Sequence, residues 1–514
     1  MKKISLLITL PVLLLISSVY AQNKNNTSPP NIIMFLVDDM GWQDTSLPFW
    51  DKTTPFNRRY HTPNMVRLAT EGMKFTQAYA TPVCTPTRVS LMTGMNAARH
   101  RVTNWTSAKD HIHGMEKNHK SLIIPEWNMN GLSPVAGDPH AVYATPLPQL
   151  LKDAGYYTIH VGKAHFGARG TVGADPLNIG FDVNIGGTGA GQPGSYLGTD
   201  NYGNGIKRLE PWAVPNMEEY YGKDIFLTEA LTLEALKAMD TAVNNKKPFF
   251  LYMAHYALHT PIMADQRFLK KYTDMGLDPI EAKYATLVEG MDKSLGDLMD
   301  YLKKNNLDQN TIILFMSDNG GLSAVGRGGE KHTHNKPLSS GKGSVREGGI
   351  REPMIVRWPG KVNPGTVTDQ YVIIEDFYPT ILEMAGIKKI RTVQKIDGIS
   401  FIPVLKEKKT KEQNRPLFWH YPNEWGPSGP GIGATSTVRK GDWKLIYYHN
   451  DESFELFNLK NDIGEHQNLV NSNPKKVKEL AKILSGYLVK VKAQMPVHKE
   501  SGKRVSLPID AIEK

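Results

Sequence analysis

The sequence predicts an α/β fold with a large, mainly parallel sheet flanked by helices, followed by a smaller C-terminal α+β subdomain with an antiparallel sheet. Apolar runs that end in polar residues, such as Asn31–Val37 and Thr311–Met316, suit strands buried on both faces of a parallel sheet. Helical patterns alternate with these runs along the chain. Near Arg415 the pattern changes to short aromatic stretches separated by turns, which suit antiparallel strands.

The expected elements can be placed in chain order by these patterns. We expect helices at 60–72, 147–154, 224–243, 279–305, 371–385 and 474–491, and strands at 31–37, 156–161, 248–254, 311–316, 354–358, 417–419, 443–448 and 455–459. A further helix is expected to begin at Pro86, with Thr85 as its N-cap, and long loops are expected at 100–145, 180–222 and 322–349. The glycines at 186–194 lack the ending of a phosphate-binding P-loop, so we interpret them as an ordinary loop.

The composition is that of a soluble globular protein, with 40% hydrophobic and 22% charged residues in a chain of 514. A chain of this length can bury a large core and is expected to form more than one domain. The formal net charge of +10 suits either attraction of a polyanion or solubility alone, and both interpretations stay open. The chain has no basic run interleaved with aromatic residues and no zinc-finger spacing, so we expect no nucleic-acid partner.

The N-terminus has the pattern of an export signal. Met1–Lys3 is positively charged, Ile4–Ile16 is almost wholly apolar, and Val19–Ala21 ends in small residues suited to cleavage. The apolar run is too short to span a membrane, and no cysteine near the cleavage site could carry a lipid. We therefore expect a signal peptide at 1–21, an N-terminal domain at 22–414 and a C-terminal subdomain at 415–514, in a periplasmic or secreted protein without a stable membrane anchor.

Cys84 is the only cysteine in the chain, so it cannot take part in an internal disulfide. Thr85 is a suitable N-cap and Pro86 suits the first position of a helix. This placement puts the sulfur at the positive end of a helix, beside Arg88, where an anion would be stabilised. A thiol retained in an oxidising compartment indicates a reactive residue, although a lone cysteine is more often a small buried side chain.

Two of the expected strands end in acid-bearing pairs, Asp38-Asp39 and Asp318-Asn319. In an open parallel sheet the ligand crevice lies beyond the carboxyl ends of the strands, so pairs that are distant in sequence can meet there. Three carboxylates and an amide oxygen would form an all-oxygen site, which suits Ca²⁺ or Mg²⁺ rather than zinc. The alternative is that these residues only end strands and begin turns.

Several segments within residues 30–360 resemble, in the same order, those of formylglycine-dependent type I sulfatases of the alkaline-phosphatase-like superfamily, in particular bacterial carbohydrate sulfatases. The matching segments are Val37–Gly41, Cys84–Gly94, Gly162–His165, Tyr252–Pro261, Ser317–Gly320, Gly341–Gly343 and Glu347–Pro353. In this family the pattern Cys-x-Pro-x-Arg marks the cysteine that is oxidised to formylglycine. The stretch from Glu455 to Leu469 resembles the family's C-terminal subdomain, and Ala164 departs from the tryptophan that the family often has.

The resemblance implies a sulfuric ester hydrolase in which a maturation enzyme oxidises Cys84 to formylglycine, whose hydrated aldehyde is the nucleophile. It implies that the formylglycine oxygen contacts a metal, Ca²⁺ or alternatively Mg²⁺, that is held by Asp38, Asp39, Asp318 and Asn319. The remaining implied roles are stabilisation of the nucleophile and sulfate by Arg88 and Lys163, sulfate binding by Lys342, protonation of the leaving alcohol by His259, and deprotonation of the hydrate by His165. His255 matches the family pattern less well than His259 and is expected to be a supporting residue.

Export, basic charge and loops that bear Trp and His favour a sulfated carbohydrate as substrate, attacked at the end of a polysaccharide fragment. The candidate substrate-binding residues are Trp105, His111, Arg327, His334, His420 and Trp425. Alternatives are an arylsulfatase, a phosphoester or phosphonate hydrolase of the same superfamily, and an exported glycan-binding protein without catalysis.

Overall fold

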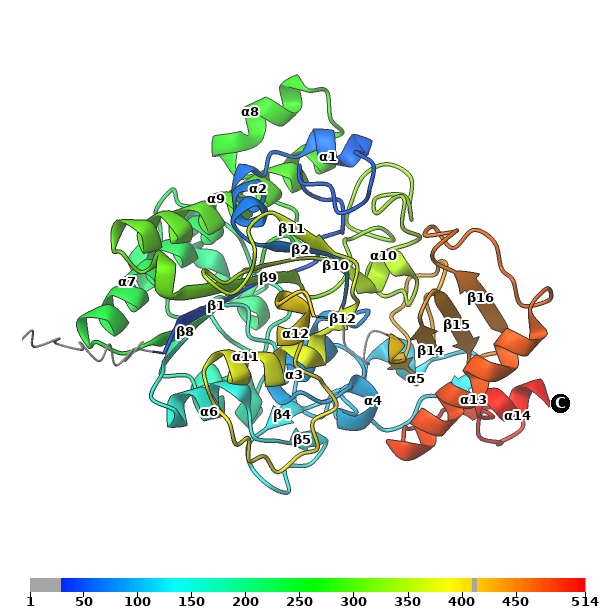
Figure 1. Cartoon of the computed structure of the whole chain (residues 1–514). Helices are drawn as coiled ribbons and strands as arrows, with labels where there is room; N and C mark the ends of the chain where they lie inside the picture. Colours follow the sequence, from blue (N-terminus) through cyan, green and yellow to red (C-terminus); the bar gives the residue numbers. More distant parts are fainter. Residues whose placement is uncertain (1–28, 409–413, 514) are drawn as a thin grey trace, which may run out of the picture.

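The computed structural model describes residues 29–408 and 414–513 (Figure 1). Its largest sheet has nine strands, namely β1 (Asn31–Val37), β2 (Met73–Tyr79), β6 (Tyr157–Gly162), β7 (Val183–Ile185), β8 (Phe249–Ala254), β9 (Thr311–Ser317), β10 (Arg351–Arg357), β11 (Thr366–Thr368) and β12 (Val372–Ile373). They lie in the order β11-β2-β10-β9-β1-β8-β6-β7, with β12 beside β2. Strand β10 runs antiparallel to β9 and β2, whereas the other described pairs are parallel. The predicted mainly parallel sheet is confirmed.

Strand β1 lies inside this sheet, between β9 and β8, and its side chains divide between two apolar cores. Met34 and Leu36 belong to one core, and Phe35 and Val37 belong to the other. Because both faces of the strand are covered, the run is apolar at every position instead of at alternate positions.

Helices cover both faces of the sheet (Figure 1). On one face lie α2 (Pro63–Glu71), α7 (Leu227–Asn244), α8 (Gln266–Asp274) and α9 (Pro279–Lys304), and on the other lie α3 (Cys84–Thr93), α6 (Leu147–Asp153), α11 (Phe377–Met384) and α12 (Ile402–Leu405). Within the ranges that the structure describes, none of the helices has the length and apolar character needed to span a bilayer. The signal peptide expected at 1–21 lies outside the described residues.

The C-terminal part contains a second, four-stranded antiparallel sheet, as predicted. Its strands are β13 (Leu417–Tyr421), β14 (Thr435–Lys440), β15 (Trp443–Tyr448) and β16 (Phe454–Asn458), and α13 (Pro474–Lys490) and α14 (Pro508–Ile512) pack against it around a separate apolar core. Figure 1 shows this unit beside the large sheet. The domain boundary at 415 stays a prediction.

The remaining described elements are short. They are α1 (Pro55–Arg59), α4 (Ala97–His100), α5 (Gly114–Lys117), α10 (Glu347–Ile350), β3 (Leu122–Ile123), β4 (Gly131–Ser133), β5 (Ala141–Tyr143) and β17 (Val497–His498), with 3₁₀ turns η1 (Val172–Ala174), η2 (Pro176–Ile179), η3 (Gly198–Gly203), η4 (Glu210–Trp212), η5 (Glu218–Tyr220), η6 (Asp308–Asn310) and η7 (Ile374–Asp376). Seven of them, α5, β3, β4, β5, η3, η4 and η5, lie in the segments that we expected to be long loops.

The structure corrects the sequence prediction at β2, at β14, in the segment 371–385 and at the start of helix α3. Strands β2 and β14 were not predicted, because their sequences, MKFTQAY and TSTVRK, carry polar residues at several positions. The segment 371–385 begins as strand β12 and becomes α-helical only at Phe377. Helix α3 begins at Cys84, with Val83 as the N-cap in place of Thr85, because the Thr85 hydroxyl bonds to the His165 ring.

A buried ionic cluster joins the two sheets. Lys444 on β15 lies 3.0 Å from Glu347 of α10 and 2.9 Å from Glu465, and all three side chains are fully buried. Burial opposes ionisation of Glu347, but Lys444 and Arg351 outweigh burial and lower its pKa to about 2. At Glu465 burial outweighs Lys444 and raises the pKa to about 7, so the lysine neutralises Glu347 above all.

We predict that Lys444→Met lowers the free energy of unfolding by ~3–5 kcal/mol, because it leaves two buried carboxylates without their shared cation. The matched control is Lys440→Met, whose ion pair with Glu479 is exposed and is worth about 0–1 kcal/mol. Urea unfolding of both variants measures the difference. Equal destabilisation by the two substitutions would contradict this account of the cluster.

Candidate active site

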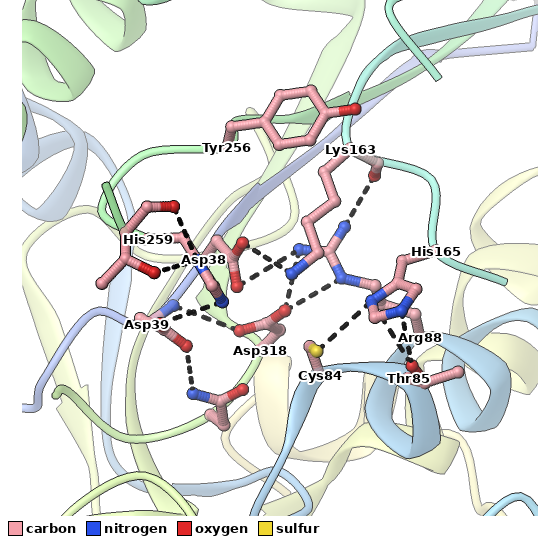
Figure 2. Close-up of polar contacts among 12 residues, drawn as sticks. Asp38, Asp39, Cys84, Thr85, Arg88, Lys163, His165, Tyr256, His259 and Asp318 are labelled. Atoms are coloured by element: carbon pink, nitrogen blue, oxygen red, sulfur yellow. Dashed lines mark hydrogen bonds and ion pairs between the residues drawn. The ribbon is translucent and has the colours of Figure 1, made fainter. Parts of the chain in front are cut away.

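Four neighbouring parallel strands, β9, β1, β8 and β6, place their carboxyl ends at one edge of the large sheet. Asp38-Asp39 follows β1, Asp318-Asn319 follows β9, Lys163 and His165 follow β6, and His259 follows β8. The close-up in Figure 2 shows these side chains pointing toward one another from separate strands. The sheet thus brings together residues that lie up to 280 positions apart in the sequence.

The centre of this cluster is acidic and buried. Asp38, Asp39 and Asp318 each offer an oxygen, and these oxygens all lie within 4.8 Å of one another. All three side chains and Asn319 are 0% exposed. Asn319 donates from Nδ2 to Asp39 Oδ1 at 2.8 Å. This buried oxygen cluster could bind a metal ion of the kind that prefers oxygen ligands.

Two oxygens of the cluster have no hydrogen-bond partner among the described residues, namely Asp38 Oδ1 and Asn319 Oδ1. Buried polar atoms are normally hydrogen-bonded, because an unpaired one keeps the full cost of leaving water. The residues present therefore fit a divalent cation, which would use these lone pairs.

The two aspartates of β1 have opposite pKa shifts. Burial raises the pKa of Asp38 well above its ordinary value, and the Asp318 carboxylate adds to this rise. Burial also acts on Asp39, but Lys342 and His259 outweigh it and lower its pKa below the ordinary value. The charge of the cluster thus depends on the cations around it.

Arg88 connects helix α3, which begins at Cys84, to the acidic cluster. Its guanidinium is fully buried, and Nε and Nη2 lie 2.9 and 2.8 Å from Asp318 Oδ2. Nη1 donates to the main-chain oxygen of Lys163 at 2.7 Å. Arg88 therefore holds a carboxylate of β9 and the backbone after β6 in one fixed relation to Cys84.

Two lysines contact the other carboxylates. Lys163 Nζ lies 2.7 Å from Asp38 Oδ2, and Lys342 Nζ lies 2.7 Å from Asp39 Oδ1. Burial opposes the charge of Lys342, but Asp39 and other anions outweigh burial and raise its pKa above the ordinary value. Each of the three carboxylates is consequently paired with a different cation.

Cys84 is the first residue of α3, and its side chain faces His165. Sγ lies 3.3 Å from His165 Nδ1, while His165 Nε2 lies 2.8 Å from the carbonyl oxygen of Thr106. A carbonyl only accepts hydrogen bonds, so Nε2 carries the proton and Nδ1 presents its lone pair to position 84. Burial, together with the neighbouring Lys163, lowers the pKa of His165, which keeps the ring neutral.

His259 lies on the opposite side of the cluster from His165 (Figure 2). Its Nδ1 lies 3.0 Å from the carbonyl oxygen of Thr260, so Nδ1 is the donor and Nε2 faces Asp39 Oδ2 at 3.7 Å. Burial and the charge of Lys342 lower the pKa of the ring. His255, by contrast, is fully buried and bonds through Nε2 to Ser294 between β8 and α9, which is a packing position.

A pocket of about 220 Å³ opens above Cys84. Its wall includes His165, His259 and Lys342 and three tryptophans, namely Trp105, Trp212 and Trp425. Trp105 and Trp425 are thus placed where the sequence analysis expected substrate contacts. Trp425 is held against the chain at Gly343, where a Cβ atom would come within 2.0 Å of its ring.

Four other candidate substrate-binding residues do not line this pocket. His111 is exposed beside His113. Arg327 is buried and pairs with Asp44 and Glu281. The remaining two have partners of their own, since the ring of His334 bonds to the carbonyl oxygen of Gly328, and the ring of His420 bonds to Ser436 and to the carbonyl oxygen of Gln494.

The pocket also contains residues that the sequence analysis did not single out. They are Thr106, Ser107, Arg169, Gly189, Ala190, Gly191, Gln192, Trp212, Thr260, Leu322 and Val325. The glycine-rich segment that we interpreted as an ordinary loop forms part of the pocket wall. It passes so close to the His165 ring that a Cβ atom at Gly191 would come within 2.7 Å of it. The density of glycines was the available signal for this close approach.

Comparison with known proteins identifies the family. A family model described as Sulfatase matches residues 30–387, and one described as N-sulphoglucosamine sulphohydrolase, C-terminal, matches residues 341–494. A sulfatase of Formosa agariphila is 30% identical and covers 98% of this chain and 97% of its own length. The N-acetylgalactosamine-6-sulfatase of Mus musculus is 31% identical and covers 89% of this chain and 79% of its own length.

Solved structures agree with these matches. The crystal structure of Ps i-CgsB in complex with k-i-k-neocarrahexaose has 28% sequence identity and a TM-score of 0.69, and covers 90% of this chain and 93% of its own. The PsFucS1 sulfatase from Pseudoalteromonas sp. shares the fold, with a TM-score of 0.64 at 21% identity over 90% of this chain and 91% of its own. By family, fold and site, the chain belongs to the sulfatase family and is a sulfuric ester hydrolase.

Proposed function

We propose that this protein removes sulfate from a sulfated carbohydrate, using a formylglycine made from Cys84 and a bound divalent cation. The observation that carries the proposal is the position of Cys84, which begins helix α3 at the base of the pocket and faces the lone pair of His165. The sequence around it, Cys-x-Pro-x-Arg, is the pattern that precedes formylglycine formation in the family that this chain belongs to.

We propose Ca²⁺ as the cation, with Mg²⁺ as the alternative, held by Asp38, Asp39, Asp318 and Asn319. The donor set is all oxygen and buried, and two of its atoms lack hydrogen-bond partners in the described part of the chain. A bound cation would supply positive charge that stabilises the sulfuryl oxygens and the nucleophile. The residue at position 84 would complete its ligands.

The modification at position 84 explains why an exported protein would keep one buried cysteine. A hydrated aldehyde offers one hydroxyl for attack on sulfur and a second hydroxyl whose deprotonation expels the sulfate, which a thiol does not offer. We propose that His165 takes this second proton through Nδ1, which already faces the Cys84 side chain. The modification requires a formylglycine-generating partner enzyme, which fits the proposed export through residues 1–21.

His259 is the proposed acid for the leaving alcohol, because its ring lines the pocket and Nε2, 3.7 Å from Asp39 Oδ2, is the nitrogen that the Thr260 carbonyl does not engage. Burial and Lys342 lower the pKa of His259 in the protein alone. A bound sulfate ester adds negative charge beside the ring and so favours its protonated form. Substrate binding would thereby prepare the acid that the reaction needs.

Lys342 and Lys163 are the proposed sulfate ligands. Arg88 is proposed to position them through its contacts with Asp318 and the main-chain oxygen of Lys163. Lys342 lines the pocket, whereas Lys163 is fully buried against Asp38. Cations that are fixed before the reaction stabilise charge on the sulfuryl group without reorganisation, which is usually the largest contribution to rate.

The carbohydrate substrate is supported by the wall of the pocket and by the relatives. Three tryptophans offer flat faces of the kind that stack on sugar rings. Two relatives named above are, by their names, an N-acetylgalactosamine-6-sulfatase and a structure with a bound neocarrahexaose. We propose action on a sugar at the end of an oligosaccharide, since the pocket that Cys84 lines has a volume of only about 220 Å³.

We predict that active protein carries an aldehyde at position 84. The peptide that contains Thr81–Arg88 should have the mass of the formylglycine form, and Cys84→Ala should release no sulfate from sulfated oligosaccharides. Sulfate and phosphate release are measured side by side, so that a phosphoester hydrolase would be recognised. Unmodified cysteine in fully active protein, or wild-type activity in Cys84→Ala, would contradict the proposal.

We predict that His259→Gln lowers kcat for a sulfated sugar by ~10²–10⁴-fold, because the alcohol then leaves without a proton. The loss should be much smaller for an aryl sulfate, whose phenolate leaves more readily. The control is His61→Gln, since the His61 side chain is 58% exposed and its side-chain partners within the described ranges are Glu289 and Lys271. An equal loss with both substrates would rule out the acid role.

We predict that a chelator abolishes activity and lowers the melting temperature, and that Ca²⁺ restores both. A ligand present at 100 times its Kd adds about 2.7 kcal/mol to the free energy of unfolding. Asp318→Asn should lose this Ca²⁺-dependent stabilisation, whereas Asp51→Asn, which changes an exposed carboxylate, should keep it. Full activity after complete removal of divalent ions would exclude the metal site.

A further inference from the structure

The pocket wall contains a cation that the proposed reaction does not use. Arg169 follows the Lys163–His165 segment, lines the pocket and is half-buried. Its main chain is fixed, because its N–H donates to Ser107 O at 3.0 Å and its carbonyl accepts from Lys109 N at 2.9 Å. The side chain thus extends from a rigid piece of backbone.

Arg169 differs from the other cations of the site in having no counter-ion. Arg88, Lys163 and Lys342 each lie within 3 Å of a carboxylate oxygen. The described residues provide no carboxylate partner for Arg169, whose only recorded side-chain contact is a 3.4 Å bond from Nε to Ser107 O. A half-buried guanidinium without a counter-ion has lost part of its hydration without compensation.

Ser107 adds a second unused group at the same place. Its hydroxyl oxygen is buried and has no hydrogen-bond partner in the described parts of the chain, although the residue lines the pocket. A guanidinium and a hydroxyl offer several donors to the oxygens of a carboxylate or a sulfate. Both side chains come from paired segments of backbone, so the separation of their main chains is fixed.

The rest of the wall favours an anion at this position. Among the described residues that line the pocket there is no aspartate or glutamate, and the acidic cluster beneath is paired with its own cations. The polar side chains of the wall, apart from the proposed catalytic ones, are Thr106, Ser107, Arg169, Gln192 and Thr260. The wall therefore carries positive charge at two places, Lys342 and Arg169.

We infer that Arg169 and Ser107 form a second anion-binding position, so that the preferred substrate carries a carboxylate or a further sulfate in addition to the sulfate ester that is cleaved. The inference rests on the proposed function, since it concerns the substrate of the same pocket. It narrows that substrate from sulfated sugars in general to sugars with two anionic substituents.

Binding without turnover tests this inference directly. Calorimetry on Cys84→Ala compares three probes, namely a neutral monosulfated sugar, a disulfated sugar and a monosulfated disaccharide that contains a uronic acid. The two doubly charged probes separate a sulfate from a carboxylate as the second anion. Adding Arg169→Ala should weaken binding of at least one doubly charged probe by about 10- to 100-fold, and should leave the neutral monosulfated sugar unchanged.

Kinetics on the matured wild-type background provide an independent measurement if the double variant does not fold. Arg169→Ala should raise KM for the doubly charged substrate with little change in kcat, and Arg169→Lys should recover part of the loss. The control is Lys109→Ala, which removes the same charge from an exposed side chain outside this pocket. It should change neither parameter.

The outcomes separate the two proposals. If Arg169→Ala changes KM equally for the neutral monosulfated and the doubly charged substrates, or changes it for neither, the second anion-binding position is wrong. Sulfate release in that case would leave the sulfatase proposal intact. Absence of sulfate release from all substrates by protein that carries the aldehyde would overturn the proposed function itself. An equal effect of Lys109→Ala would mean that only the general positive charge of this region matters.

Discussion

The structure depends on the enclosure of three carboxylates at one edge of a parallel sheet. Asp38, Asp39 and Asp318 lie within 4.8 Å of one another without exposure to water, an arrangement that repulsion and lost hydration would disfavour. The fold compensates by placing a cation on each of them. These cations come from three separate segments, so the charge balance of the site holds together α3, the end of β6 and the loop before α10. The chemistry and the local fold therefore share the same interactions.

A second group of contacts fixes the backbone that carries these charges. Asp39 has a φ of 59°, a left-handed conformation that a residue with a side chain rarely adopts. The single proton of the Tyr284 hydroxyl is shared between Asp44 Oδ2 at 2.7 Å and the carbonyl oxygen of Asp39 at 3.1 Å, and Asp44 in turn pairs with Arg327. Arg327, which was expected to bind substrate, thus acts beneath the site as a support for the strained turn after β1. The Arg327 guanidinium is paired with the carboxylates of Asp44 and Glu281, so it does not line the pocket.

The sequence predicted the features that follow from local pattern. Buried strands are continuous apolar runs, so the acidic strand ends were recognised, and sheet geometry required them to meet. The pattern did not reveal which loop residues face the pocket. His334 bonds to a neighbouring carbonyl oxygen and Arg169 lines the pocket, but nothing in the surrounding sequence distinguishes these two environments. It also missed β14, where polar residues are buried by contacts with distant segments, as with Ser436 against His420 and Arg439 against Tyr79. The orientation of the loop residues and the burial of β14 depend on contacts between residues distant in sequence. The spacing of apolar residues in one sequence does not reveal such contacts.

The two cations that line the pocket, Lys342 and Arg169, differ in their electrostatic surroundings. The carboxylates beneath Cys84 are neutralised locally, so their negative field is reduced where a sulfate ester would approach. The cations that remain accessible from the pocket, Lys342 and Arg169, can then act on an incoming anion. Lys342 is shared with Asp39, so binding an anion there competes with an existing ion pair, whereas Arg169 has no such competitor among the described residues. An anionic group would therefore gain more from a contact with Arg169 than from one with Lys342. We expect Arg169 to discriminate between substrates, and Lys342 stays the proposed ligand of the sulfate that reacts.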